Sequence, residues 1–271
     1  MTVQAKVQLS EGTGHSGTPT GATAEVGEVA LSFDNISMQF PDGTQALENV
    51  SLTIQRNEFV SVVGPSGCGK STLLKIASGL FPQTGGVVKV DRDQLGYTFQ
   101  DATLLPWRKV QGNVELLMEL RGYSAEKRRQ IAQEQIKMVG LDGFGDHYPK
   151  RLSGGMRMRA SLARSLALKP SVFMFDEPFG ALDEITRERL NDELVSLFMR
   201  NGFTGLFITH SIPEAVYLSS KVLVMSRRPG RILQEFEIPF DYPRDPNLRY
   251  TSEFASLCNE INVALRDAIE Q

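Results

Sequence analysis

Residues 64–72 read Gly64-Pro65-Ser66-Gly67-Cys68-Gly69-Lys70-Ser71-Thr72 and fit the pattern G-x-x-x-x-G-K-[ST] of a phosphate-binding loop. An apolar, β-branched run over residues 59–63 precedes them and predicts a buried strand. Residues 73–77 follow with helical character. The motif therefore has the strand–loop–helix context that it needs, which a glycine-rich turn matching by chance would lack.

The chemistry of this loop follows from its residue types. Gly64, Gly67 and Gly69 let the backbone turn its N–H groups toward a polyphosphate at a helix N-terminus. Lys70 is placed to reach the β- and γ-phosphates, and the Ser71 hydroxyl to hold Mg²⁺. The sequence thus predicts a nucleoside triphosphate and Mg²⁺ as cofactors. Cys68 is most simply a small residue that fits the loop, with a redox role as the alternative.

The composition is that of an ordinary globular protein, with 41% apolar and 23% charged residues in 271. The net charge of −3 argues against a chain that holds nucleic acid electrostatically. No run approaches 18 apolar residues and the N-terminus lacks a signal-peptide pattern, so the cytoplasm is the expected location. Two distant cysteines indicate neither a disulfide framework nor a metal site.

The chain divides into segments of different character. Residues 1–28 are rich in Gly, Thr, Ser and Ala and predict a disordered leader. From residue 29, alternating apolar residues predict short antiparallel strands that lead into the nucleotide core. Phe40 ends the first of these strands, where its ring could cover an adenine base or fill the core, and periodicity leaves both open.

Residues 101–162 turn helical and predict a small helical subdomain, with Ser124 as an N-cap. The segment Leu104-Leu105-Pro106-Trp107 within it is either local core or a surface for a partner. Ser153, Gly154 and Gly155 stand at a helix start, where they form either a simple cap or a second anion-binding device.

Two more apolar runs end in polar side chains. Residues 172–175 are followed by Asp176 and Glu177, and residues 205–209 by His210. Because ligands bind at the carboxyl ends of parallel strands, we expect all three side chains beside the phosphate loop. Asp176 would hold Mg²⁺ through water, and Glu177 would orient or deprotonate an attacking water. Adjacent carboxylates in a solvated turn are the alternative.

The last part of the chain, residues 236–271, is expected to be a C-terminal extension that follows an edge hairpin around Pro229-Gly230. Within it, apolar residues recur at helical spacing and predict an amphipathic docking helix. These residues are Phe254, Leu257, Ile261, Leu265 and Ile269.

Taken together, residues 29–235 resemble the ATP-binding subunit of ABC transporters. The phosphate loop, Gln100, the signature Leu152-Ser153-Gly154-Gly155, the Asp176-Glu177 pair, the Ala181-Leu182-Asp183 turn and His210 stand in the family's order. The resemblance implies an α/β fold: a P-loop NTPase (RecA-like) core with an antiparallel β subdomain and a small α-helical subdomain. Residues 104–107, Met156, residues 184–187 and residues 226–231 look like the nitrate/sulfonate/taurine importer branch.

The resemblance also implies a mechanism. Two copies would face head to tail, with ATP between Lys70 and Ser71 of one chain and the signature of the other. Glu177 would act on the water, and His210 would steady the γ-phosphate. Gln100 would sense Mg²⁺ and the water, and Asp183 would link the two sites. A membrane permease would be driven from the cytoplasmic face, and a periplasmic or extracellular solute-binding protein would act indirectly.

The sequence departs from the family pattern at Asn57, where glycine is usual, and at Met158, where glutamine is common. Asn tolerates the left-handed conformation, so the turn at Asn57 should survive. The main rival function is a soluble ATPase of the same superfamily that acts as a non-transport switch. A kinase or GTPase function is less well supported, because neither uses the signature. A regulatory module without catalysis is also less well supported, because Lys70 and Glu177 are both present.

Overall fold

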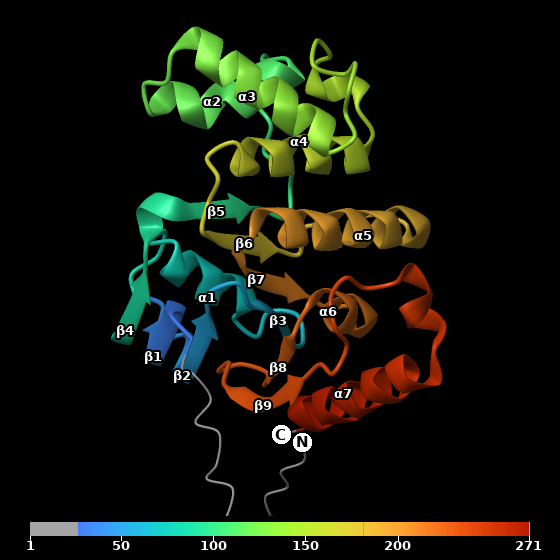
Figure 1. Cartoon of the computed structure of the whole chain (residues 1–271). Coiled ribbons are helices and arrows are strands. Elements are labelled where there is room, and N and C mark those ends of the chain that lie inside the picture. The colour runs from blue at the N-terminus through green and yellow to red at the C-terminus, as the bar shows by residue number, and fades with distance from the viewer. Residues whose placement is uncertain (1–26, 181, 271) are drawn as a thin grey trace, which may run out of the picture.

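A six-stranded, mostly parallel sheet forms the centre of the protein (Figure 1). The structure is a computed structural model that describes residues 27–180 and 182–270. The leader expected over residues 1–28 therefore lies almost wholly outside the described residues. The strand order is β5-β6-β7-β3-β8-β9, and all neighbours pair in parallel except β8 and β9. These strands are β3 (Phe59–Val63), β5 (Leu95–Thr98), β6 (Val172–Asp176), β7 (Thr204–Thr209), β8 (Lys221–Met225) and β9 (Ile232–Glu237).

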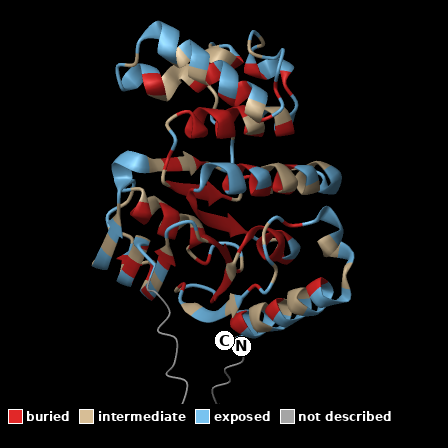
Figure 2. Cartoon of the chain, in the orientation of Figure 1, coloured by how far each residue is buried: buried red, intermediate tan, exposed pale blue. Residues whose placement is uncertain are grey.

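The central strands are apolar because helices or strands cover both faces of the sheet. Every residue of β3, β6 and β7 is buried. Alternate side chains enter two separate apolar clusters: Phe59 and Phe207 face one, whereas Val60 and Ile208 face the other. The red strands of Figure 2 show this buried centre, which fixes the carboxyl ends of three strands at one edge.

A second sheet, with the order β2-β1-β4, is antiparallel. It consists of β1 (Val29–Gln39), β2 (Gln45–Gln55) and β4 (Gly85–Val90). Its apolar face closes the second core cluster over the phosphate-loop helix. Asn57, which follows β2, has φ of 60°, so the expected left-handed turn is confirmed.

Helices complete the layers around the parallel sheet. Three of them, α2, α3 and α4, form a layer of their own beside β5 (Figure 1), as expected for the helical subdomain. Ser124 caps α3 as predicted, because its side chain accepts the N–H of Lys127. The helices are α1 (Lys70–Ala77), α2 (Val110–Leu120), α3 (Ala125–Met138), α4 (Gly154–Leu166), α5 (Glu184–Asn201), α6 (Ile212–Leu218) and α7 (Ser252–Glu270), with short 3₁₀ turns at Arg92–Gln94, Pro149–Arg151 and Pro246–Tyr250.

The amphipathic C-terminal helix forms as α7 and packs against α6, β8 and β9. Phe254 and Ile261 are buried, as the spacing predicts. Ile269 was expected on the same face, but its side chain is 44% exposed and Ala268 is buried instead. The 3.6-residue period drifts from a strict four-residue spacing over this length, so the buried stripe has moved one residue by the last turn. Within residues 27–180 and 182–270, no helix combines the length and apolar character needed to cross a bilayer.

Candidate nucleotide-binding site

The phosphate loop connects the end of β3 to the start of α1. Gly69 caps α1 with φ of +116°, and a Cβ there would lie 2.7 Å from Leu47 Cδ2, so only glycine fits. Lys70, the first residue of α1, is 5% exposed. Its Nζ donates to Gly64 O at 2.8 Å and to Pro65 O at 3.0 Å. The ammonium group is thus held inside the curve of the loop, where a polyphosphate would meet it.

The predicted acidic pair lies at this same edge of the sheet. Ser71 Oγ donates to Asp176 Oδ1 at 2.7 Å, which joins the start of α1 to the end of β6. Glu177 has φ of 46°, and its N–H donates to Ile208 O of the neighbouring strand. This positive φ is uncommon for a residue with a side chain and costs on the order of 1 kcal/mol. The backbone bond to β7 holds the residue there.

Glu177 connects the loop lysine to the strand-end histidine. Its Oε1 lies 3.8 Å from Lys70 Nζ, and its Oε2 lies 3.2 Å from His210 Nδ1. The Glu177 side chain is 21% exposed and that of His210 53%, so the group is open to solvent on one side. The expectation that Asp176, Glu177 and His210 lie beside the phosphate loop agrees with these contacts.

The oxygen atoms around Asp176 fit Mg²⁺ better than a softer metal. The Ser71 hydroxyl and the Asp176 carboxylate are hard donors, and Tyr97 donates its hydroxyl to Asp176 Oδ2 at 3.2 Å. Across the described part of the chain, no three His, Cys, Asp or Glu side chains form a cluster that could hold a metal. An ion here would need water and phosphate oxygens to complete its shell, which is the usual state of protein-bound Mg²⁺.

Two other predicted site residues are less tightly placed. Gln100 is exposed, two residues beyond the end of β5, and has no hydrogen bond to Ser71, Asp176 or Glu177 among the residues described. Phe40 follows β1 and is half-buried, with its ring 6.1 Å from that of Phe81 in an edge-to-face contact. Its ring both packs on the core and remains partly open, so the two functions considered for it are compatible.

A signature cluster, where the start of α4 meets the start of α5, consists of Ser153, Gly154, Gly155 and Asp183. Ser153 caps α4, because its Oγ accepts the N–H of Met156 at 3.3 Å. A Cβ on Gly154 would lie 3.7 Å from Leu182, and one on Gly155 would lie 3.1 Å from Thr186. Asp183 caps α5 through the N–H of Thr186, which holds the pKa of its carboxyl below the ordinary value. Ala181 lies outside the described residues.

Within one chain, this signature cluster stays apart from the phosphate loop. In the described ranges, no hydrogen bond or ion pair joins Ser153, Gly154, Gly155 or Asp183 to residues 64–72. The resemblance implies that Ser153, Gly154 and Gly155 bind the nucleotide held by Lys70 of a second copy, and that Asp183 links the two sites. In a single copy of the chain they are not brought to it.

Two residues that support the site were not identified in the sequence analysis. Tyr97 lies in β5, and burial raises the pKa of its hydroxyl, so it remains a neutral donor to Asp176. Arg164 of α4 donates to the carbonyl oxygens of Ala102 and Thr103, and so ties the signature helix to the segment after Gln100. The position of Tyr97 near a strand end was a usable signal, whereas nothing local marks Arg164.

Cys68 is 1% exposed, and burial raises the pKa of its thiol. The thiolate is the reactive form of cysteine, so this environment disfavours redox chemistry. Of the two interpretations considered, a small residue that fits the loop is the better supported.

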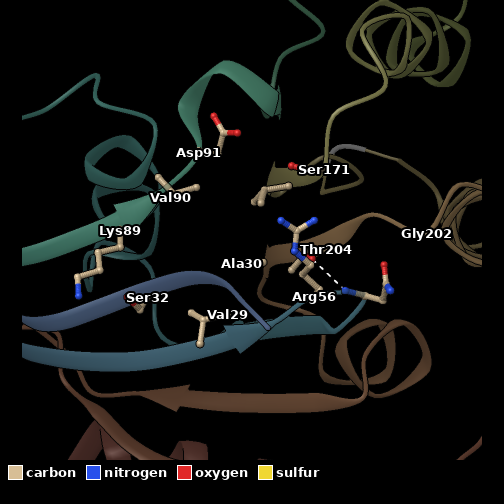
Figure 3. A pocket seen from close by; sticks show the side chains of 12 residues that line it. Val29, Ala30, Ser32, Arg56, Lys89, Val90, Asp91, Ser171, Gly202 and Thr204 are labelled. Carbon is tan, nitrogen blue, oxygen red and sulfur yellow. Dashed lines mark hydrogen bonds between the residues drawn. The ribbon is translucent and has the colours of Figure 1, made fainter. Parts of the chain in front are cut away.

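A separate pocket lies at the opposite edge of the sheet, near the starts of β6 and β7 (Figure 3). Its volume is about 280 Å³, and Arg56, Lys89 and Thr204 are among its lining residues. Arg56 is paired with Glu28 at 2.8 Å. Since the candidate nucleotide site is at the carboxyl ends of the strands, this pocket is not part of it.

Comparison with known proteins agrees with this geometry. The family described as "ABC transporter" matches residues 47–180. An uncharacterized ABC transporter ATP-binding protein of Methanocaldococcus jannaschii is 43% identical over 89% of this chain and 93% of its own length. The aliphatic sulfonates import ATP-binding protein SsuB of Bacillus cereus is 39% identical over 80% of this chain and 89% of its own length.

Solved structures show the same fold. The ATP-binding cassette MJ0796, solved as a dimer with ADP and phosphate after hydrolysis, aligns with a TM-score of 0.70 at 32% identity. It covers 78% of this chain and 100% of its own. The protein cbiO1 of Clostridium perfringens, part of the transporter complex cbiONQ, aligns with a TM-score of 0.73 at 23% identity, over 89% of this chain and 97% of its own. The predicted fold class is confirmed, and the chain belongs to the ATP-binding proteins of ABC transporters, a family of ATPases whose hydrolysis is coupled to transport.

Proposed function

We propose that this chain is the ATP-binding and ATP-hydrolysing subunit of an importer for a small anionic or organic solute of the nitrate, sulfonate or taurine kind. The observation that carries the proposal is the meeting of Lys70, Glu177 and His210 at one edge of the sheet. The similarity to a protein named for import of aliphatic sulfonates supports the solute class. The alternative, a non-transport switch of the same superfamily, shares the ATPase chemistry and differs in its partner.

The chain's own residues suit hydrolysis of the γ-phosphate. Glu177 accepts a proton from the attacking water, or orients that water, at its carboxylate oxygens. His210, with Nδ1 next to Glu177, presents its other ring nitrogen to the γ-phosphate. Mg²⁺, held by Ser71 and through water by Asp176, would neutralise phosphate charge, and Gln100 would sense the ion once the nucleotide is bound. Lys70 neutralises the remaining charge from within the loop.

A second copy of the chain completes the site in this proposal. The separation of the signature cluster from the phosphate loop within one chain supports that arrangement. Ser153 and the N-terminus of α4 would then offer a hydroxyl and free N–H groups to the γ-phosphate bound by the other copy. The dimeric state of the solved cassette MJ0796 supports the same view.

The partner in the membrane would bind near Trp107. This side chain is 70% exposed, and a hollow of about 590 Å³ lies beside it, lined also by Arg108, Lys109 and Tyr148. An exposed aromatic group at a hollow is typical of an interface anchor. We therefore place the chain on the cytoplasmic face of the cell membrane, bound to permease subunits, with the solute-binding protein acting indirectly. The net charge of −3 gives no support for a nucleic-acid partner.

The first experiment compares steady-state ATP hydrolysis by the wild type and Glu177→Gln, with dimerisation followed by light scattering. Wild-type turnover, together with an inactive variant that ATP converts to a dimer, supports the proposal. Glu260→Gln is the matched control, because this exposed glutamate on α7 has the same charge and lies away from the site. Turnover by the wild type as a monomer, with an active Glu177→Gln, contradicts the two-chain mechanism.

The transport function needs a cellular test. In the organism that carries the gene, deletion followed by complementation with the wild type or Glu177→Gln is scored by uptake of labelled sulfonate, taurine and nitrate. Loss of uptake of one solute, restored only by the wild type, identifies the cargo. Normal uptake of all three in the deletion strain favours the non-transport switch.

A further inference from the structure

The turn between β8 and β9, residues 226–231, lies directly against the phosphate loop. A Cβ on Gly230 would lie 2.3 Å from Cys68 O, and one on Gly64 would lie 3.1 Å from Met225 O. Gly230 also donates its N–H to Ala46 O in β2 at 2.9 Å. The backbone of this turn is therefore one wall of the loop, and side chains on the turn can act on the loop.

The turn has its own internal supports. Ser226 Oγ donates toward Pro229 O at 2.9 Å and accepts the N–H of Arg231 at 2.9 Å. Arg231 forms an ion pair with Glu48 of β2. At the other side, the N–H of Arg227 reaches Ala268 O of α7 at 3.5 Å. The turn is thus fixed to β2 and α7 independently of its contact with the phosphate loop.

Arg228 is the side chain that reaches from this turn to Gly67 in the phosphate loop. Its Nη2 donates to Gly67 O at 2.9 Å and its Nε to the same oxygen at 3.2 Å. Bonds from a charged donor are stronger than those between neutral groups. Gly67 has φ of +74°, and because glycine has no Cβ, nothing in the residue itself restrains its backbone to this conformation. The two bonds from Arg228 supply a restraint at that position.

The planarity of the peptide bond shows what this restraint does. In a trans peptide, the C=O of Gly67 and the N–H of Cys68 point in opposite directions. Because Arg228 holds the Gly67 oxygen outward, the Cys68 N–H points into the loop, where its acceptor is Pro65 O at a long 3.4 Å. An inward N–H with a weak partner is what a phosphate oxygen needs.

We infer that Arg228 is a positioning residue of the nucleotide site, which orients the Gly67–Cys68 peptide so that its N–H faces the polyphosphate. This inference rests on the proposed function. It differs from the roles of Lys70 and Ser71 because Arg228 acts through the backbone of the loop. The charge of Arg228 also acts on Asp42, whose pKa is held below its ordinary value first by the hydrogen bond from the backbone of Thr44.

The inference predicts a change in binding that is separate from the chemical step. Without Arg228, the Gly67–Cys68 peptide can rotate, and the loop binds the polyphosphate more weakly. Glu177, His210 and Lys70 keep their positions. We expect Arg228→Ala to raise the KM for ATP and the Kd for ADP about fivefold to tenfold, the effect of losing one charged hydrogen-bonding group. We expect kcat to stay within about twofold, as for loss of binding that is equal in ground and transition states.

The test uses the full-length protein and compares Arg228→Ala and Arg228→Lys with the matched control Arg227→Ala. Arg227 is the adjacent exposed arginine, and its side chain has no hydrogen bond or ion pair among the described residues. Calorimetric titration with ADP gives Kd, hydrolysis gives KM and kcat, and thermal unfolding reports the fold. The lysine variant, which keeps the charge and one donor direction, should recover part of the affinity.

The outcomes separate this inference from the proposed function. Three results together support the inference: Arg228→Ala binds ADP more weakly, it unfolds at the same temperature as Arg227→Ala, and Arg228→Lys recovers part of the affinity. Wild-type affinity in Arg228→Ala overturns it, as does an equal loss in Arg227→Ala. If Arg228→Ala does not fold, wild-type affinity in Arg228→Lys overturns it and a twofold to fivefold loss supports it. Failure of the wild type itself to bind ADP would contradict the proposed function instead.

Discussion

A buried carboxyl group behind the candidate site predicts how the stability of this protein depends on pH. Glu214 of α6 is 5% exposed, and burial raises its pKa from 4.5 to about 7, against the opposing effects of the Thr209 hydroxyl, Arg187 and His210. Its Oε2 is hydrogen-bonded to Thr209, the residue before His210, whereas Oε1 has no partner among the described residues. The protonated acid is therefore the form that suits the folded protein.

The sign and size of the effect follow from these pKa values. Between pH 4.5 and 7 the unfolded chain releases a proton that the folded chain keeps, so the free energy of unfolding falls as pH rises. Above about pH 7 both states ionise and the loss levels off. Each pKa unit corresponds to about 1.4 kcal/mol, and the folded chain keeps its proton over nearly two pH units between pH 5 and 7, so the loss from this one group between pH 5 and 8 is about 2.5 kcal/mol. Glu214→Gln replaces the acid by a neutral group of similar shape and removes this dependence.

Urea unfolding of the wild type and Glu214→Gln, followed by far-UV circular dichroism at pH 5, 6, 7 and 8, measures the effect. The difference between the two curves removes the contribution of all other titrating groups. We expect the free energy of unfolding of the variant to gain about 2.5 kcal/mol relative to that of the wild type over this range. A difference that stays constant with pH would refute a raised pKa for Glu214 and with it the derivation from burial.

Three further predictions concern the core and the site. Gly205→Ala should destabilise the fold by about 1–3 kcal/mol, because the new Cβ would lie 2.5 Å from the ring of Phe59, and thermal unfolding would show no shift if the ring can move aside. Ser71→Ala should raise the Mg²⁺ concentration for half-maximal hydrolysis, since it removes the hydroxyl beside Asp176; an unchanged Mg²⁺ titration would contradict this. Phe40→Ala should weaken ATP binding at least about fivefold while Phe40→Trp binds normally, if the ring stacks on adenine, and equal affinities would leave Phe40 a core residue alone.

The parts of the fold that could be predicted are those encoded by short stretches of sequence. The strands β3, β6 and β7 are buried at every position and mostly apolar because both faces of the sheet are covered. Each is followed directly by a residue of the candidate site, namely Gly64, Glu177 and His210. The parallel-sheet rule then brings these ends together without any knowledge of strand order. Helix caps such as Ser124 and Asp183 are equally local.

The parts that could not be predicted depend on contacts between distant segments. Nothing in the sequence around Arg164 or Arg228 indicates which group its side chain contacts. Arg164 reaches a backbone carbonyl oxygen 61 positions away, and Arg228 reaches one 161 positions away. A carbonyl acceptor carries no side-chain signal, since every residue has one. For the same reason, the buried position of Glu214 is set by the packing of α6 on β7 rather than by any pattern near residue 214.

This difference also explains why the site needs two kinds of restraint. Lys70, Ser71 and Asp176 are fixed by direct side-chain contacts at the edge of a buried sheet, which is rigid because both faces are packed. The loop between β3 and α1 is rich in glycine, and its N–H groups can turn only because glycine permits it. That freedom lowers the order of the loop unless another element holds it. In this chain the turn between β8 and β9 contacts Gly67 and can hold the loop, which makes this turn part of the phosphate site.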